Sequence, residues 1–504
     1  MRPLDPLAVP LDGVRLIEAS AGTGKTWTIA GLYLRLLLER GLEVPEVLVV
    51  TFTNAATEEL RDRIRKRVRE ALAVAQGRAD GDDLLRALLA RVGEGEVTRQ
   101  RLADALARMD ELAVFTIHGF CQRVLQDNAF ESGTLYDAEL VTDEQALRRE
   151  IVEDFWRRRL YDASPADLAW ALAEWPDPGA LLAEVGSLVG AGEVRLLPEA
   201  DGGEAERDLA TAFEALRRNW TAGRGAVEGL LTGNPALHGG WYAAEKVAAA
   251  LAAADALCSN ETPPAELPDA KALELLTADK IARSTGKGKA PPLHPFFDLC
   301  ARVLAAHPRA RQARRVSLLR EAAGYLRAEL DARKAARRVL FFDDLLGHLD
   351  RALTGPGGAA LAERLRRQYP AALIDEFQDT DPVQYRIFRR IYADQAGGAL
   401  YLIGDPKQAI YGFRGADVFT YMQAVRELDP GAARFTLATN WRSSGPFVEA
   451  VNTLFGRVPR AFLIDEIPYV AVAPAGRADA APLLIDGQAP VPLLMWRLRR
   501  PPAE

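Results

Sequence analysis

A short apolar run that ends in a glycine-containing turn constrains this chain more than any other segment. Residues 14–20 (VRLIEAS) predict a buried strand, and residues 26–39 predict a helix because apolar side chains recur there at helical spacing. The intervening turn fits the pattern G-x-x-x-x-G-K-[ST], except that Ala19 stands at the first glycine position. A strand, a phosphate loop and a helix in this order are typical of a parallel α/β domain that binds a nucleotide.

Each residue type in this loop has a chemical role in binding a nucleotide. Gly22 and Gly24 allow the backbone to wrap around a phosphate, and the following helix begins with N–H groups that attract anions. Lys25 is predicted to reach the β- and γ-phosphates, and the Thr26 hydroxyl to bind Mg²⁺. A glycine turn with a solvated lysine is the alternative, but the flanking strand and helix favour the phosphate loop. The predicted ATP-binding residues are Ala19, Ser20, Ala21, Gly22, Thr23, Gly24, Lys25 and Thr26.

Another apolar run, at residues 371–374 (AALI), predicts a buried strand, and two adjacent carboxylates, Asp375 and Glu376, follow it directly. We expect Asp375 to bind Mg²⁺ and Glu376 to act as the general base that activates water. An acidic helix cap is the alternative, but the polar run that follows, residues 377–380 (FQDT), is longer than a cap requires. Further strands are predicted at residues 47–51, 400–403 and 435–437.

Between residues 131 and 335 the pattern changes to helices rich in alanine, leucine and arginine. We interpret this segment as an inserted all-helical domain. Its insertion accounts for the 350 positions between Lys25 and Asp375, which a minimal nucleotide-binding fold would bring together within one small domain.

Composition excludes some classes of protein. No apolar run reaches the roughly 18 residues that a membrane span needs, and the N-terminus lacks a secretory apolar segment, so a cytoplasmic protein without membrane contact is expected. The three cysteines are too far apart for a zinc site or a disulfide framework. The net charge of −7 speaks only mildly against a nucleic-acid partner, because binding needs a local basic groove.

Four segments in a fixed order resemble the UvrD and Rep class of superfamily-one DNA helicases. They are the phosphate loop, DEFQDTDP at 375–382, GDPKQAIYGFRGAD at 404–417 and TNWRSS at 439–444. Within that class, residues 49–64 (VVTFTNAATEELRDRI) and 115–133 (FTIHGFCQRVLQDNAFESG) resemble the RecB branch, which belongs to exodeoxyribonuclease V (RecBCD). The resemblance covers most of the chain and is loosest in the helical insertion.

The resemblance implies roles for further residues. Gln408 would link the γ-phosphate to DNA contacts, and Arg442 would stabilise charge on the γ-phosphate, its alternative being a surface ion pair. The aromatic rings of Tyr411 and Phe413 would stack on bases, although a buried aromatic pair has the same pattern. Polar residues at two strand ends would hold one DNA strand, and for His118 a purely structural role is the alternative. The implied DNA-binding residues are Thr51, Phe52, Thr53, Asn54, Thr116, His118, Tyr411 and Phe413.

The resemblance also implies a fold and domain boundaries. The fold is α/β, a RecA-like P-loop NTPase parallel sheet with an inserted helical domain and the start of a second RecA-like domain. The implied parts are residues 1–130 and 336–440 for the first RecA-like domain, 131–335 for the insertion and 441–504 for the second domain, which would be truncated.

The implied function is that of an ATP-dependent, Mg²⁺-requiring DNA helicase with DNA-stimulated ATPase activity. It would move 3′ to 5′ on single strands from duplex ends, in a heterotrimer with RecC-like and RecD-like subunits that serves double-strand break repair and recombination. The nuclease domain of RecB is not expected within these residues. The alternative is a scaffold that binds nucleotide and DNA without turnover. A small-molecule kinase is disfavoured because GDPKQ and NWRSS have no role there.

Overall fold

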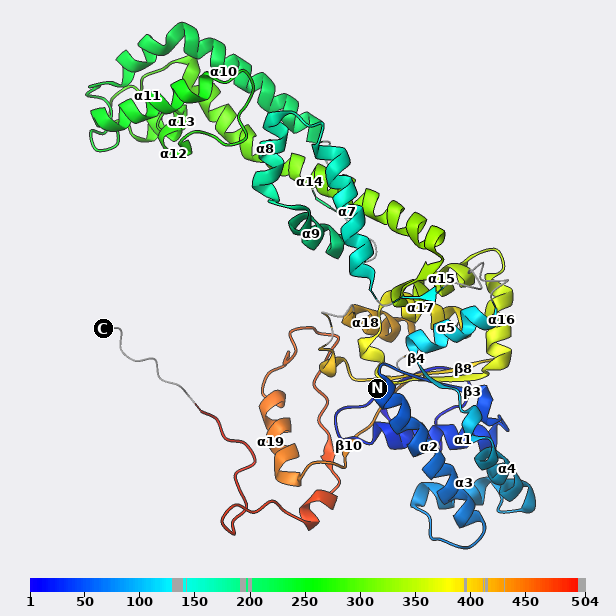
Figure 1. The fold of residues 1–504 in the computed structure, drawn as a ribbon. Helices are drawn as coiled ribbons and strands as arrows, with labels where there is room; N and C mark the ends of the chain where they lie inside the picture. The colour runs from blue at the N-terminus through cyan, green and yellow to red at the C-terminus, as the bar shows by residue number, and fades with distance from the viewer. Residues whose placement is uncertain are drawn as a thin grey trace. The chain divides into compact units, whose positions relative to one another are not determined.

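The computed structural model describes residues 1–128, 139–141, 143–190, 196–197, 202–393, 397–410, 412, 416–429 and 431–496. The chain forms two compact units (Figure 1). Unit 1 combines Met1–Leu140 with Leu340–Glu504, and unit 2 is Val141–Val339. The short strands β5 (Glu139–Leu140) and β6 (Val339–Leu340) lie at the two points where the chain passes from one unit to the other.

A seven-stranded sheet forms the centre of unit 1, and all its neighbouring strands are parallel. The strand order is β1-β9-β2-β8-β7-β3-β4. The five predicted strands are confirmed with small shifts of their ends, and β1 and β4 complete the sheet. The bounds are β1 (Arg2–Pro3), β2 (Gly13–Glu18), β3 (Val47–Thr51), β4 (Val114–Thr116), β7 (Ala371–Ile374), β8 (Ala399–Gly404) and β9 (Arg434–Thr436).

Successive side chains of these strands enter two separate cores, because neighbouring residues of a strand point to opposite faces. Ile17, Val49 and Leu373 belong to the core on one face, whereas Leu16, Val50 and Ile374 belong to the core on the other. The first face is covered by α1 (Lys25–Glu39), α2 (Asn54–Ala75), α3 (Asp83–Val92) and α4 (Glu96–Ala107). The second is covered by α5 (Ile117–Asp127), α15 (Phe342–Thr354), α16 (Gly358–Gln368), α17 (Pro382–Tyr392) and α18 (Val418–Glu427). The result is a three-layer α/β fold of the RecA-like kind.

Parallel pairing brings the ends of the motif-bearing strands to one edge of the sheet. Glu18 of β2 is aligned with Gly404 of β8, and Thr51 of β3 with Thr116 of β4. The loops that follow these strands contain the segments predicted to bind ligands. Beyond β9 the described chain forms β10 (Thr439–Asn440), α19 (Gly445–Gly456) and β11 (Ala473–Pro474), with β10 and β11 paired in parallel.

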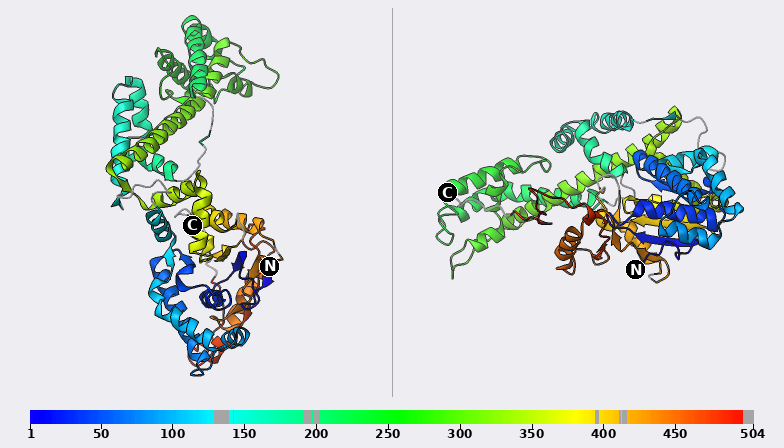
Figure 2. Two further views of the ribbon diagram at one scale, coloured as in Figure 1. Left: turned by 90° about the vertical axis from the view of Figure 1, so that its right-hand side faces the viewer. Right: turned by 90° about the horizontal axis from the view of Figure 1, so that it is seen from below.

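Unit 2 consists of helices packed on one long helix, α14 (Pro295–Arg337), which has 43 residues and is therefore about 65 Å long. Figures 1 and 2 show α10 (Gly202–Leu231) beside the first part of α14. No helix among the described residues, α14 included, has a stretch long and apolar enough to cross a membrane. The other helices are α7 (Glu144–Leu160), α8 (Pro165–Glu174), α9 (Pro178–Gly190), α11 (Ala244–Cys258), α12 (Ala270–Glu274) and α13 (Ala278–Arg283).

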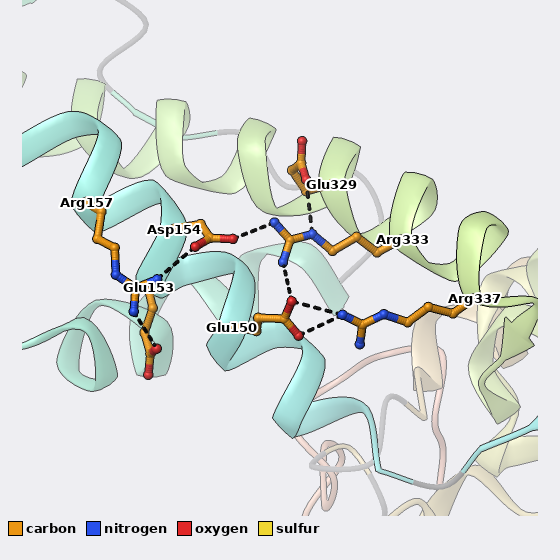
Figure 3. Close-up of polar contacts among 7 residues, drawn as sticks. All are labelled: Glu150, Glu153, Asp154, Arg157, Glu329, Arg333 and Arg337. Carbon is orange, nitrogen blue, oxygen red and sulfur yellow. Dashed lines mark hydrogen bonds and ion pairs between the residues drawn. The ribbon is translucent and has the colours of Figure 1, made fainter.

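An ion-pair network fastens α7 to the last turns of α14 (Figure 3). Arg333 contacts Glu150 at 2.8 Å and Asp154 at 2.6 Å on α7, and Glu329 at 3.1 Å on its own helix. Arg337 contacts Glu150 again, at 2.9 Å. The Arg333 side chain is 18% exposed, so these contacts are more shielded from water than a typical surface pair.

We predict that Arg333→Met lowers the stability of unit 2 by about 1 to 2 kcal/mol, because it leaves three carboxylates without their shared cation. For a unit of this size, each kcal/mol of lost stability lowers the Tm by about 2 to 4 °C. The measurement is thermal unfolding followed by circular dichroism. Arg218→Met is the control, because the Arg218 side chain is 73% exposed and lies 3.9 Å from its partner Glu214. Equal shifts for the two variants would contradict the role given to the network.

Candidate functional site

The loop between β2 and α1 has the backbone that phosphate binding requires. Gly22 and Gly24 have φ angles of +80° and +91°, a left-handed region that side chains other than glycine rarely adopt. Thr23 closes the turn by donating its N–H and its hydroxyl to the Ser20 carbonyl, at 3.1 and 2.6 Å. Gly24 is the N-cap of α1 and no side chain caps the helix there, so the first N–H groups of the helix face the loop.

The segment Asn440–Arg442 lies directly against this loop. The Asn440 side chain donates to the Ala21 carbonyl at 3.1 Å, and the Trp441 N–H donates to the Gly22 carbonyl at 2.8 Å. The Asn440 side-chain oxygen accepts from the N–H groups of Arg442 and Ser443, each at 2.9 Å. Arg442, the predicted γ-phosphate arginine, is thus held beside the loop with an exposed side chain.

Trp441 adds an aromatic surface that the sequence reasoning did not assign. Its side chain is 56% exposed, and its ring lies 3.6 Å from where a Cβ atom on Gly24 would be. The TNWRSS motif contains this tryptophan, but the sequence alone does not indicate that its ring lies against the phosphate loop.

Both predicted carboxylates meet the loop lysine. The Lys25 ammonium forms an ion pair with Glu376 and lies 3.4 Å from Asp375. The Asp375 N–H donates to the Val50 carbonyl at 2.8 Å and so continues the strand ladder by one residue. Glu376 then adopts a left-handed backbone with φ +54°, which is uncommon for a residue other than glycine and frequent at functional sites.

Burial and neighbouring charges shift the pKa values of Asp375, Asp379 and Lys25. It raises the pKa of Asp375 to about 6, although the neighbouring Lys25 acts in the opposite direction. Burial also raises the pKa of Asp379 to about 6, and the charge of Glu376 adds to this effect. Burial alone would lower the pKa of Lys25, but Asp375 and Glu376 outweigh it and raise that pKa. Lys25 therefore remains a cation, and a metal ion near Asp375 would favour the ionised carboxylate.

Gln378 connects this group to the next loop. Its side-chain nitrogen donates to Glu376 at 2.8 Å and to Asp379 at 3.0 Å, and its side-chain oxygen accepts from the Asp405 N–H at 2.9 Å. Asp405 in turn accepts from the side chain of Gln408 at 2.9 Å. Gln408, predicted to sense the γ-phosphate, is thereby linked to the predicted general base. Gln378 and Asp405 were not predicted as site residues, although the polar run FQDT was noted.

The residues predicted to contact a DNA strand differ in their surroundings. Thr53 and Thr116 are the N-caps of α2 and α5, and their hydroxyls accept from Ala56 and Gly119, each at 3.1 Å. Asn54 is exposed and Phe52 is half-buried. Tyr411 and Phe413 lie outside the described residues, so their predicted stacking role has no structural account.

Thr51 and His118 differ in accessibility. The Thr51 side chain has no exposed surface, and its predicted contact with a DNA strand remains a prediction. His118 is half-buried, and its ring meets the edge of Phe342 with centroids 6.4 Å apart. Phe342, which is 43% exposed, gives this part of the edge an aromatic surface.

The donor set fits ATP with magnesium. Among the described residues no three or more His, Cys, Asp or Glu side chains are arranged to hold a metal ion by themselves. Mg²⁺ commonly uses one or two protein oxygens and completes its shell with water and substrate phosphates. Asp375 and Thr26 provide such oxygens beside the glycine loop, whose positive φ angles leave space for phosphates against the backbone.

Comparisons with known proteins agree with this geometry. Residues 5–222 and 252–429 match the UvrD/REP helicase N-terminal domain. The chain is 41% identical, over 98% of its length, to the RecBCD enzyme subunit RecB of Escherichia coli K12, and 34% identical, over 93%, to that of Haemophilus influenzae Rd. It is 32% identical, over 88%, to that of Mycobacterium tuberculosis H37Rv. The chain covers 42%, 42% and 30% of these relatives, less than half of each.

We predict that Gly22→Ala weakens nucleotide binding by about 10-fold or more, because the added Cβ would lie 3.0 Å from Arg442 and Asn440 and fill the loop. Titration with a fluorescent ATP analogue measures the effect. Gly77→Ala is the matched control, since Gly77 has φ +68° but no atom within 4 Å of an added Cβ. Both substitutions impose a backbone cost of roughly 1 to 2 kcal/mol. Equal affinities for the two variants would argue against the loop as the nucleotide site.

Proposed function

The chain belongs to the UvrD/REP helicase family, and from that premise we propose that it binds ATP and Mg²⁺ and couples ATP hydrolysis to movement along single-stranded DNA. The observation that carries this proposal is the convergence of Lys25, Asp375, Glu376 and Gln408 at one edge of the parallel sheet. These groups come from three separate segments, and each has the chemistry that a coupled ATPase requires.

ATP would bind with its phosphates on the glycine loop. The N–H groups at the start of α1 would hold them, Lys25 would reach the β- and γ-phosphates, and Arg442 would offset charge as the terminal phosphoryl group leaves. Trp441 would offer its exposed face to the base. Bound by Asp375 and Thr26, Mg²⁺ would neutralise charge on the β- and γ-phosphates.

Glu376 would accept a proton from the attacking water. In the nucleotide-free arrangement its carboxylate is occupied by Lys25 and by Gln378. When Lys25 pairs with a phosphate in place of Glu376, one oxygen of Glu376 becomes available to accept a proton from water. The other oxygen still accepts the hydrogen bond from Gln378. The same exchange would move Lys25 from a protein carboxylate to the substrate.

A single DNA strand would lie across the loops that follow β3 and β4. Phe52, Asn54 and His118 provide accessible aromatic and polar groups there, as non-specific strand binding requires. Gln408 is linked to Glu376 through Asp405 and Gln378, so a change at the γ-phosphate would alter the position of the segment that contains Gln408.

The similarity to RecB supports a more specific role. We propose a 3′ to 5′ motor subunit that engages duplex ends, assembles with RecC-like and RecD-like partners as in exodeoxyribonuclease V, and serves double-strand break repair and recombination. Because the chain spans less than half of these relatives, a second candidate is a module that binds nucleotide and DNA but does not turn over alone.

The test is steady-state ATP hydrolysis by the purified chain with Mg²⁺, with and without single-stranded DNA. We expect DNA to stimulate turnover and Glu376→Gln to reduce kcat by about 100-fold or more, with nucleotide affinity largely retained. Glu363→Gln is the control, because Glu363 is an exposed residue of α16 that pairs with Arg367 on the same helix. Nucleotide binding without turnover would favour the binding module, and unchanged hydrolysis by Glu376→Gln would remove Glu376 from its role.

A further inference from the structure

A second buried ion cluster lies beside the site, and two of its three members, Glu18 and Lys407, have no role in the reaction described above. Glu18 is the last residue of β2 and directly precedes the phosphate loop. Its carboxylate pairs with the ammonium of Lys407, which also lies 2.7 Å from Asp405. The three side chains are only 4%, 9% and 4% exposed, in the order Glu18, Lys407 and Asp405.

A buried cluster of charged side chains contributes little net stability to a fold. Removing three charged groups from water is strongly unfavourable, and apolar residues of similar volume would often be as stable. Burial would lower the pKa of Lys407, but Glu18 and Asp405 together raise it, so the lysine remains a cation that both carboxylates need. What the ions provide and apolar packing would not is a fixed geometry between two loops.

The cluster joins the two ends of the phosphate loop through the Gln408 segment. At one end, Glu18 holds Lys407, whose own N–H donates to Asp405 at 3.1 Å. Asp405 accepts from Gln408 and donates its N–H to Gln378.

The path then returns to the loop. Gln378 donates to Glu376, and Glu376 pairs with Lys25, the residue that follows the second glycine of the loop. A shift of any one of these groups therefore changes the geometry of all the others.

We propose that Lys407 is a positioning residue for ATP hydrolysis: by pairing with Glu18 and Asp405 it fixes Gln408 relative to the phosphate loop and so couples nucleotide state to the DNA-binding surface. This inference rests on the proposed function. The Lys407 ammonium is held by two protein carboxylates and its side chain is only 9% exposed, so we expect it to act through Gln408 and not by touching ATP or DNA.

The test compares Lys407→Met, which removes the cation but keeps the length, with Lys407→Arg, which keeps the charge. Lys66→Met is the control, because the Lys66 side chain is 66% exposed and 3.9 Å from its partner Glu70. Three quantities are measured for the purified chain: Tm, kcat and KM for ATP with and without single-stranded DNA, and the affinity for a fluorescent oligonucleotide with and without a non-hydrolysable ATP analogue.

For Lys407→Met we expect kcat in the presence of DNA to fall on the order of 10-fold to 100-fold, as small misplacements of catalytic groups do, while KM changes little. We also expect the analogue to lose its effect on oligonucleotide affinity. Lys407→Arg should recover part of both properties. The double variant Glu18→Gln with Lys407→Met should lose no more than Lys407→Met alone, because the two residues act as one unit.

A Lys407→Met chain with a lower Tm but with wild-type kcat and wild-type response to the analogue would overturn the inference, since Lys407 would then be only structural. Absence of DNA-stimulated turnover in the wild-type chain would reject the proposed function instead. In that case the oligonucleotide measurement decides alone. An analogue effect present in the wild type and lost in Lys407→Met supports the inference, and any other pattern overturns it.

Discussion

The side-chain amide of Gln378 is the contact on which the arrangement of the site depends. The parallel sheet brings the ends of β7 and β8 to the same edge, but it does not fix the loops that follow them. Gln378 does so with both of its side-chain polar atoms hydrogen-bonded, in a position that is only 2% exposed. The fit is close enough that Gly404 must lack a side chain, because a Cβ atom there would lie 2.5 Å from the Gln378 oxygen. An amide in this position can donate to a carboxylate and accept from a backbone N–H at once, which neither an ionised carboxylate nor a lysine ammonium can do.

Two lysines at this edge solve the same electrostatic problem in the same way. Lys25 lies between Asp375 and Glu376, and Lys407 lies between Glu18 and Asp405. In each case a cation makes it possible to place two carboxylates close together away from water. In the proposed function Lys25 would exchange its partners for phosphates because it is next to the glycine loop, whereas Lys407 pairs with Glu18 and Asp405. The net charge of −7 does not reveal this arrangement, because it sums over the whole chain whereas the site depends on a few local charged groups.

The sequence predicted those parts of the fold that depend on local patterns. The strands at 47–51 and 371–374 have the predicted bounds, because uninterrupted aliphatic runs between polar turns have few alternatives. The two-residue strand β1 has too little sequence to form a pattern, and it exists because β9 offers it an edge. Thr51 was predicted to contact DNA because it is polar and ends a strand, but the sequence did not indicate that its side chain is buried, because that burial depends on packing against the sheet. Glu18 was a visible anomaly, a charge at the end of a buried strand, yet its partner could not be found without the strand order.

That strand order also determines when the phosphate loop can form during protein synthesis. β2, which precedes the loop, has no neighbour among the strands that are made soon after it, since its two partners are β8 and β9. Both partners are translated only after the whole of unit 2. At a translation rate of about 5 to 20 residues per second, the N-terminal strand waits for tens of seconds with its edges unpaired. α14, which is made in this interval, packs on α7, α9 and α10 of the same unit. All residues of unit 2 are therefore synthesised before the strands that pair with β2 exist.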